Sequence, residues 1–478
     1  MRRVALAIVL GVCVFAPAAG ATLPLSFAGL YDDGTSGLAE QARLGVGIVR
    51  QPLEWSRVER SPGRFDFSAY DGYFAEAARA GVSVLPFLVS PPPFRSRRPP
   101  RSRSKAMYPP KSNMAFAAFA SAAVQRYGPT GSFWSEHPDV PFLPVHSWQI
   151  WNEPNIPNWW RSGPSARGYV RLLRAAYPAI KRVDSNAEVV AAGLPNSNLG
   201  IPFLRYLAAM YRAGAAHWFD TLAIHPYSRD VEGVLRLAEQ ARRVMNRRHD
   251  HARLWITEFG WSTGGDASAF RVTERGQADR VAASLSALIA ERRALRLRGF
   301  VLFKWRDAVA PPELGRDPWP LHAGLLRADG SPKPSYGVFG RIMRALRGDD
   351  AAAGGDPAAG GDPAAAGGDP TLTTVVRRSV RLSPLGYAGI RLGCRSDAFG
   401  ACGGVLTLRS ATAIGCGANR MPAGTLVGSA SFRIAAVPAL VPVRIRAAAR
   451  RLVRCMRRIR VRAAAAPSAA AEFDIRAR

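Results

Sequence analysis

The amino-acid sequence predicts an α/β fold: a (β/α)8 TIM barrel, followed by a small all-β sandwich domain. Three observations predict this. Short apolar runs alternate with longer segments of helical period over residues 22–346, a low-complexity stretch follows at 347–370, and short alternating strands fill 371–478. The alternating first part holds eight strand candidates in about 325 residues, which is the size of a barrel domain.

Residues 1–21 have the pattern of a secretory signal peptide. Arg2 and Arg3 precede the apolar run 4–15, and small residues follow as far as Ala21. Because this run is too short to span a bilayer, we expect cleavage and a secreted product, by an export route that the sequence leaves open. No other segment is long and apolar enough for a membrane span, and we expect a monomer.

Residues 22–346 form the predicted catalytic barrel domain. Helices are expected at segments such as 166–182, 231–248 and 275–293. A doubly wound open sheet is the competing architecture, but no glycine-rich phosphate turn follows the first strand. The expected strands are 25–30, 46–50, 82–88, 148–151, 188–192, 221–225, 254–258 and 299–305.

Residues 347–370 are the predicted linker, because the sequence Gly-Gly-Asp-Pro occurs three times there between alanines. The accessory domain, 371–478, contains the four remaining cysteines. An even number in an exported chain predicts two disulfides, of three possible connectivities, and the absence of C-x-x-C spacing and of nearby histidine argues against zinc. These cysteines are Cys394, Cys402, Cys416 and Cys455.

The net charge of +30 comes mostly from arginine. Residues 22–346 hold 43 basic against 27 acidic residues, and residues 371–478 hold 19 Arg against 3 acidic residues. Such charge can attract nucleic acid, anionic glycans or acidic surfaces. Since no nucleic-acid module is recognisable and the composition is typical of codon bias, we expect no nucleic-acid partner. For 371–478 we expect attachment to an anionic surface or glycan, with no part in the chemistry.

Two glutamates end strands in the barrel. Glu153 ends the fourth predicted strand in Trp-Asn-Glu-Pro-Asn, and Glu258 ends the seventh in Thr-Glu-Phe-Gly-Trp. Active sites of such barrels form at the carboxyl ends of the strands, where the fourth and seventh strands face each other. A lone glutamate in such a position is commonly a salt bridge or a helix cap. A pair of such glutamates can supply the one carboxylic acid and the one carboxylate that cleavage of a glycosidic bond needs.

The two motifs resemble the acid/base and nucleophile motifs of glycoside hydrolase clan A. The resemblance covers roughly residues 25–346, and the segments 55–70 and 126–129 look closest to family 39, the β-xylosidases and α-L-iduronidases. Cellulase-like family 5 is the near alternative. The resemblance implies a barrel and retention of anomeric configuration, with Glu153 as acid/base, Glu258 as nucleophile, and no metal or cofactor.

Further side chains are expected to bind substrate or to support the glutamates. Arg50 would hold Glu258 ionised, keeping its pKa low, and Asn152 would bond a sugar 2-hydroxyl. Tyr227 is placed to bond the nucleophile. His225 would bond sugar or carboxylate, although a structural role fits it equally. A flat ring for stacking sugars is expected from Trp305, and from those of Trp159, Trp160, Trp261 and Trp319 that are not simply packed in the interior.

The substrate is expected to be a carbohydrate. Residues 95–105 carry six positive charges in eleven residues and follow the third strand, so they either favour acidic glycans at the catalytic rim or form an ordinary solvated loop. Two other functions stay open. One is a barrel that binds glycan without cleaving it, and the other is transglycosylation in cell-wall remodelling by the same chemistry.

Overall fold

The computed structural model describes most of the predicted barrel and parts of the C-terminal region. The described residues are 23–32, 34, 37–102, 107–347, 371–374, 379–381, 387–395, 402–417, 419–434, 439–464 and 471–476. The predicted signal peptide, and the predicted linker apart from Arg347, lie outside them. Over the described ranges, no helix is both long and apolar enough to cross a membrane.

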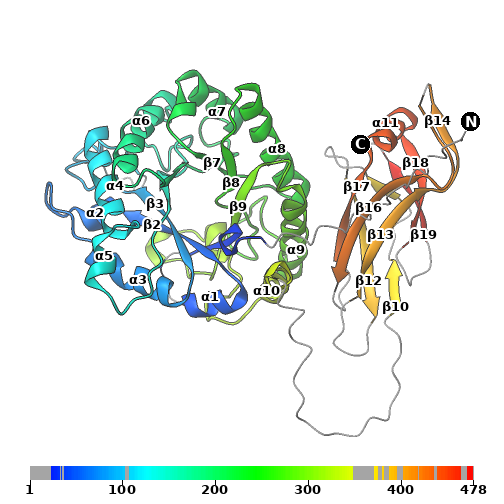
Figure 1. The fold of residues 1–478 in the computed structure, drawn as a ribbon, viewed down its shortest axis with the longest axis horizontal. Coiled ribbons are helices and arrows are strands. Elements are labelled where there is room, and N and C mark those ends of the chain that lie inside the picture. Colours follow the sequence, from blue (N-terminus) through cyan, green and yellow to red (C-terminus); the bar gives the residue numbers. More distant parts are fainter. Residues whose placement is uncertain are drawn as a thin grey trace, which may run out of the picture.

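The first part of the chain is a closed parallel barrel (Figure 1). Its strands lie in the order β5-β4-β3-β2-β1-β9-β8-β7, and β5 pairs with β7 to close the ring, with the two-residue strand β6 beside β7. The predicted barrel is therefore confirmed. The strands are β1 (Ala28–Tyr31), β2 (Ile48–Glu54), β3 (Ser83–Val89), β4 (Ser147–Ile150), β5 (Glu188–Ala191), β6 (Leu194–Pro195), β7 (Thr221–His225), β8 (Arg253–Ile256) and β9 (Leu297–Leu302).

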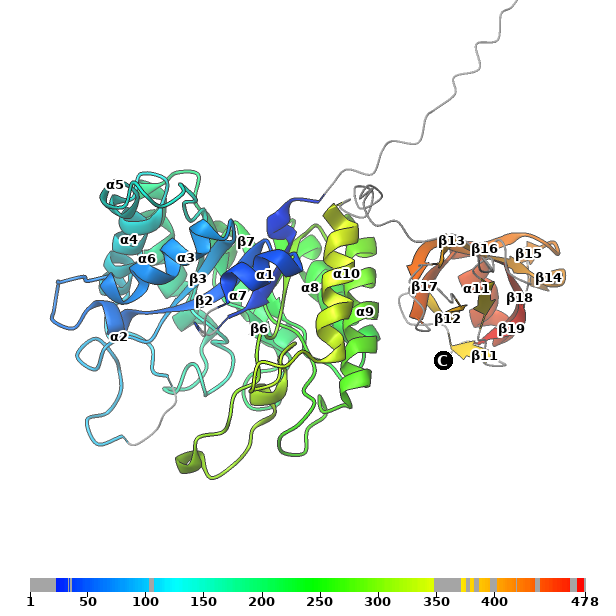
Figure 2. The same ribbon diagram turned by 90° about the horizontal axis from the view of Figure 1, so that it is seen from below.

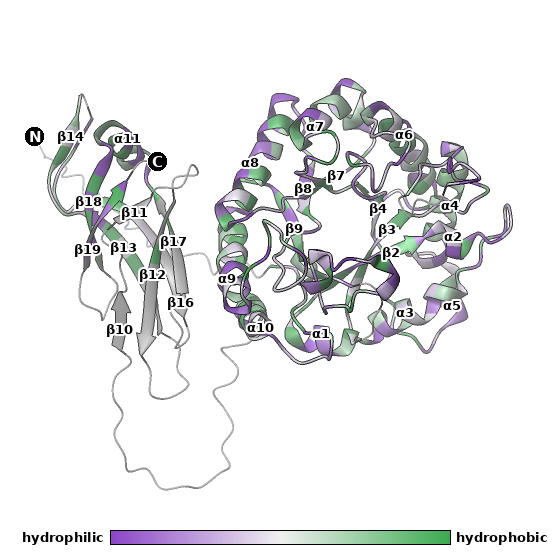
Figure 3. Ribbon diagram, turned by 180° about the vertical axis from the view of Figure 1, so that it is seen from behind, coloured by the Kyte–Doolittle hydropathy of each residue, from purple (hydrophilic) through white to green (hydrophobic). Residues whose placement is uncertain are grey.

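Helices surround the strands, and in Figure 3 the helices carry both hydrophilic and hydrophobic residues. The helix after β4 shows why: the Ser165 hydroxyl caps its first turn, and its buried residues recur every three or four positions. The helices are α1 (Leu38–Leu44), α2 (Trp55–Val58), α3 (Ser68–Arg79), α4 (Asn113–Tyr127), α5 (Ser132–Glu136), α6 (Ala166–Val183), α7 (Phe203–Arg212), α8 (Val231–Arg247), α9 (Glu274–Glu291) and α10 (Pro334–Arg347).

The barrel interior fixes which residues can form a site. Ile48, Ala223 and Trp255 belong to a small cluster of buried residues inside the ring, together with Leu85 and Val190. Because side chains alternate along a strand, the residue two positions later on the same strand points the same way. The carboxyl ends of β2, β7 and β8 therefore direct polar side chains into the mouth of the barrel, on the side where the longest loops lie (Figure 2).

The described residues after 370 form a small, mainly antiparallel β-sheet region, as the sequence predicted. One curled sheet has the order β10-β12-β17-β16-β13-β18-β19-β11, and a hairpin, β14-β15, stands apart. The bounds are β10 (Thr371–Thr374), β11 (Ser379–Arg381), β12 (Tyr387–Arg395), β13 (Cys402–Ser410), β14 (Ile414–Cys416), β15 (Asn419–Met421), β16 (Leu426–Ile434), β17 (Ala439–Ile445), α11 (Ala447–Met456), β18 (Arg458–Ala464) and β19 (Ala471–Arg476).

One of the two predicted disulfides is present among the described side chains. Cys416, at the end of β14, is bonded to Cys455 in α11. This bridge fastens the β14-β15 hairpin to the helix, which packs Leu452 and Val453 into the core of the region. The side chains of Cys394 and Cys402 lie outside the described residues, so the second bridge stays a prediction.

Candidate active site

Arg50 lies at the centre of the polar cluster in the barrel mouth. Its guanidinium is completely buried and donates three hydrogen bonds: to Gln149 Oε1 at 2.7 Å, to Glu258 Oε1 at 2.6 Å and to Asn152 Oδ1 at 2.7 Å. It also lies over the ring of Phe87, 3.9 Å from the centroid. A guanidinium held by three acceptors and one ring has a fixed position, so it fixes Glu258 in turn.

Glu258 accepts a second hydrogen bond from the opposite side. The hydroxyl of Tyr227 donates to Oε2 at 2.8 Å, and Nδ1 of His225 lies 3.4 Å from the same oxygen. The carboxylate is therefore held through both of its oxygens. The structure brings Arg50, Asn152, Tyr227 and Glu258 together here, although they come from β2 and from the segments that follow β4, β7 and β8.

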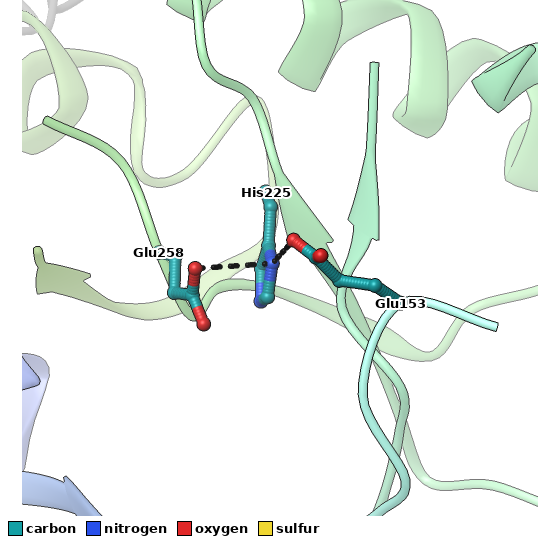
Figure 4. A group of neighbouring side chains, drawn as sticks. All are labelled: Glu153, His225 and Glu258. Carbon is teal, nitrogen blue, oxygen red and sulfur yellow. Dashed lines mark hydrogen bonds and ion pairs between the residues drawn. The ribbon is translucent and has the colours of Figure 1, made fainter. Parts of the chain in front are cut away.

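Glu153 lies on the other side of His225 (Figure 4), with its Oε1 2.8 Å from Nδ1 of His225. The backbone N–H of Glu153 donates to the carbonyl of Gly193 at 3.1 Å, and its φ of 42° lies in the left-handed region that a non-glycine residue adopts only when its surroundings enforce it. One carboxylate oxygen of Glu153 and one of Glu258 lie within 4.8 Å of each other, with a His225 nitrogen equally close.

The two carboxyl groups differ in their electrostatic surroundings. Burial, followed by the charge of Glu258, raises the pKa of Glu153 well above its ordinary value. Burial also raises the pKa of Glu258, but Arg50 and the Tyr227 hydroxyl oppose that shift. The expectation that Arg50 would give Glu258 a low pKa is therefore wrong, because desolvation outweighs the guanidinium. The expectation that Glu258 ionises more readily than Glu153 stands, since Arg50 and Tyr227 favour ionisation of Glu258 and Glu258 opposes ionisation of Glu153.

The surroundings of His225 favour its neutral form. Burial and the nearby Arg50 charge lower its pKa well below the ordinary value, and its Nε2 lies 3.0 Å from the Thr257 hydroxyl. A neutral imidazole bonds the carboxylates without adding a second cation beside Arg50. This is the carboxylate contact expected for His225.

Three residues of the cluster escaped the sequence analysis. Gln149 holds the Nε of Arg50, and Thr257 holds the far side of His225. Gly193 leaves room for the imidazole: a Cβ at this position would lie 1.9 Å from Nε2 of His225. The inward positions of Gln149 and Thr257 on predicted strands were the available signal, whereas nothing local marks Gly193.

The structure does not bring Trp305 into this cluster. Its ring is fully buried beside Tyr336 of α10, with a centroid distance of 6.1 Å. Two residues earlier, the half-buried Phe303 lies next to Tyr227 and Tyr31, and it is the aromatic ring that β9 contributes to the mouth.

Other aromatic residues surround the same opening. Trp319 lies 5.2 Å from Tyr227 and 4.9 Å from Phe270 between ring centroids, and both Trp319 and Phe270 are partly exposed. Trp159 is partly exposed and its indole lies close enough to Glu153 to oppose the rise in that group's pKa. By contrast, Trp160 and Trp261 are buried. Half of the four candidate rim tryptophans are thus packing residues.

The same donor atoms have the composition of a cation site, since Glu153, His225 and Glu258 come together. The permanent charge of Arg50, 2.6 Å from Glu258, would repel a cation there. The arrangement is better suited to proton transfer and nucleophilic attack by the two carboxyl groups.

Neither a protein-family model nor a curated protein sequence matches the chain. Several solved structures do. A family 39 glycoside hydrolase from the gut symbiont Bacteroides cellulosilyticus WH2 is 17% identical with a TM-score of 0.50, over 88% of this chain and 81% of that one. A glucosidase from Croceicoccus marinus is 16% identical with a TM-score of 0.52, over 88% and 94%. The GH39 enzyme from Xanthomonas axonopodis pv. citri is 12% identical with a TM-score of 0.50, over 88% and 94%. The chain therefore has the (β/α)8-barrel fold of glycoside hydrolases such as those of family 39.

Proposed function

We propose that the protein is a retaining glycoside hydrolase that acts by double displacement, with Glu153 as acid/base and Glu258 as nucleophile. The observation that carries the proposal is the pair of buried carboxyl groups with oxygens within 4.8 Å, one of them held by Arg50 and Tyr227. Retaining enzymes place these groups about 5 Å apart, whereas inverting enzymes need a wider gap of roughly 6.5–9.5 Å for a water molecule.

In the first half-reaction, an oxygen of Glu258 attacks the anomeric carbon while Glu153 donates its proton to the leaving oxygen. The high pKa of Glu153 keeps that proton available. The bond between the anomeric carbon and the leaving group breaks as the bond to Glu258 forms, giving a glycosyl ester. The ester is neutral, so the charge that kept Glu153 protonated is gone.

In the second half-reaction, Glu153 accepts a proton from water as that water attacks the anomeric carbon. Glu258 leaves as a carboxylate, and Arg50 and Tyr227 stabilise the charge that returns to it. Asn152 uses its Oδ1 to accept from Arg50, so its amide nitrogen is the group that can donate to a sugar hydroxyl. Trp159, Phe303 and Trp319 offer rings against which sugars can stack.

An acidic glycan is the substrate class that the rim favours. Residues 90–112, the loop after β3, contain seven Lys and Arg and no Asp or Glu. Arg95 is neutralised by the buried Glu59 at 2.7 Å, while Arg97, Arg98 and Arg101 are exposed. The loop bonds through Met107 to the backbone of Asn158 and Arg161, in the loop that begins with Glu153. Its charges would thus attract anionic chains to the mouth.

Hydrolysis of a panel of aryl glycosides and polysaccharides tests the proposal. The proposal is supported if the intact protein hydrolyses one of these substrates and if Glu153→Gln abolishes the hydrolysis of unactivated ones. A non-catalytic barrel would bind glycans and release no product from any of them. Transglycosylation would give longer products at high acceptor concentration.

We also propose that the protein is exported, because residues 1–21 have the sequence of a signal peptide. From the sequence pattern we propose the domain limits 22–346, 347–370 and 371–478.

A further inference from the structure

The C-terminal region has exposed arginine side chains on α11 and on β18, the strand that follows it. Along α11, Ala449, Leu452 and Val453 are buried, while the opposite side faces solvent. Along β18, buried and exposed residues alternate. We call the exposed set the basic face; it consists of Arg451, Arg454, Arg457, Arg458, Arg460 and Arg462.

Acidic side chains neutralise only one end of the basic face. Glu472 pairs with Arg462 at 2.7 Å, and Asp474 lies 3.4 Å from Arg460 and 3.7 Å from Arg458. Among the described side chains, no acid pairs with Arg451, Arg454 or Arg457. The sequence 371–478 contains one further acidic residue, Asp397, against 19 arginines. The helical end of the basic face therefore keeps its positive charge.

The basic face is also held in a fixed shape. Cys455, next to Arg454 in the chain, is bonded to Cys416 of the β14-β15 hairpin. The guanidinium groups of Arg451, Arg454 and Arg457 are thus presented by a helix and its following turn that the disulfide anchors, which lowers the entropic cost of binding a partner.

We propose that the basic face binds an acidic polysaccharide, one that carries a carboxylate on most of its repeating units. Guanidinium groups pair with carboxylates through two parallel hydrogen bonds, which a lysine cannot do, and residues 371–478 contain no lysine. The choice of a polysaccharide rests on the proposed hydrolase function of the barrel. Attachment through this region would raise the local concentration of such chains at the catalytic rim.

Other partners fit the basic face less well. Neutral glycans and single-stranded nucleic acids are held largely by stacking on aromatic rings, yet residues 371–478 contain few of these: no tryptophan, one tyrosine and three phenylalanines. A helix binds a membrane surface by inserting its apolar face, but the apolar side of α11 is buried in the core of its own region. Of the described large apolar side chains here, Met456 is exposed, at 39%.

Binding of the full chain to polygalacturonate tests the proposal. A Glu153→Gln background keeps the probe intact, and isothermal titration over a range of salt concentrations gives the affinity. We expect R451Q/R454Q/R457Q to lose about tenfold in affinity at low salt and to show a shallower salt dependence. The matched control is R205Q/R212Q/R247Q, which removes three exposed arginines from α7 and α8 of the barrel. It should change the affinity less than twofold.

Three results would overturn the proposal. They are an equal loss in the control, tighter binding to single-stranded DNA or phosphatidylglycerol vesicles than to polygalacturonate, and binding by the Glu153→Gln protein that salt leaves unchanged. The salt titration needs no arginine substitution, so it decides even if R451Q/R454Q/R457Q fails to fold. Hydrolysis of a small aryl glycoside should be equal in the wild type and in R451Q/R454Q/R457Q made without the background change, which separates this proposal from failure of the catalytic one.

Discussion

Arg50 and Glu258 are 208 positions apart in the sequence and form a buried ion pair with an N–O distance of 2.6 Å. The pair joins Arg50, the third residue of β2, to the segment that follows β8. Since Gln149, Asn152 and Phe87 surround the same guanidinium, Arg50 is fixed in place and, together with Tyr227, it holds the carboxylate of Glu258.

Replacing Arg50 by Gln should raise the pKa of Glu258 further, because burial would then act with less opposition. Glu258 must be ionised to attack, so the acidic limb of the kcat/KM profile should move to higher pH. At the optimum we expect a loss of about 10²–10³-fold. The pH dependence of kcat/KM checks this. Arg79→Gln, which removes an exposed ion pair with Asp139, should leave the acidic limb in place.

Gly193 should tolerate no side chain, because a Cβ there would overlap the imidazole of His225. In Gly193→Ala the ring must leave its position beside the two carboxyl groups, and a displacement near 1 Å in an active site costs on the order of 10²-fold in rate. Steady-state kinetics with an aryl glycoside provides the measurement. Gly72→Ala in α3, where a Cβ meets no atom within 4 Å, is the control. Full activity of Gly193→Ala would show that His225 needs no fixed position.

Glu188 should stabilise the barrel at neutral pH and lose this effect in acid. At the amino end of β5 it accepts hydrogen bonds from Ser147 and Thr221 and pairs with Arg253 and Arg298. Burial alone would raise its pKa, but Arg298 and the other partners outweigh burial and lower the pKa from its ordinary value. The stabilisation is therefore present above the unfolded-state pKa and disappears as the pH falls through the lower folded-state pKa.

Glu188→Gln should accordingly lower the free energy of unfolding at neutral pH by roughly 3 kcal/mol, with a smaller difference from wild type in acid. Urea unfolding at several pH values gives both numbers. Glu239→Gln, which removes an exposed pair with Arg243, should cost less than about 1 kcal/mol. A difference that grows toward low pH would mean that the sign of the pKa shift is wrong.

The exposed arginines of the loop after β3 should matter for acidic substrates alone. We expect R97Q/R98Q/R101Q to lower kcat/KM for a uronic-acid glycan about tenfold at low salt, with little change for a neutral substrate. The difference should fade as added salt screens the charges. R205Q/R212Q/R247Q again removes the same number of charges, from the outer helices α7 and α8. Equal effects on both substrates would make the loop an ordinary solvated surface.

Much of the site could be predicted because strand ends of a barrel converge whatever the intervening sequence. Glu153 and Glu258 could be predicted because they end the fourth and seventh predicted strands. Arg50 and Tyr227 could be predicted because each lies at or just after the end of a predicted strand. The barrel and the β region after residue 370 followed from periodicity. These features depend on local pattern together with one rule of topology.

The remaining features depend on contacts that the sequence does not encode locally. Trp305 was assigned to the mouth on the assumption that its strand reached residue 305, but β9 ends at Leu302. Beyond that point the alternation of sides no longer holds, and Phe303 takes the place beside Tyr227. Gly193 is defined by the ring of His225, and the pKa of Glu258 by how deeply the carboxylate is buried.

The two glutamates should respond differently to removal. Glu258→Ala should abolish turnover for every leaving group, a loss on the order of 10⁵-fold, because no covalent route remains. Glu153→Ala should slow substrates with poor leaving groups far more than activated aryl glycosides, whose departure needs little protonation. Azide should rescue each variant, with retained configuration for Glu153→Ala and inverted configuration for Glu258→Ala. Equal sensitivity of both variants to the leaving group would contradict this assignment.

Proton NMR of the first sugar released by the intact protein tests the central claim most directly. The spectrum must be recorded in the first minutes, before mutarotation mixes the anomers. Carboxyl oxygens within 4.8 Å leave no room for a water molecule behind the anomeric carbon, so we predict that the product keeps the configuration of the substrate. An inverted product would contradict the covalent intermediate and overturn the roles of Glu153 and Glu258 together.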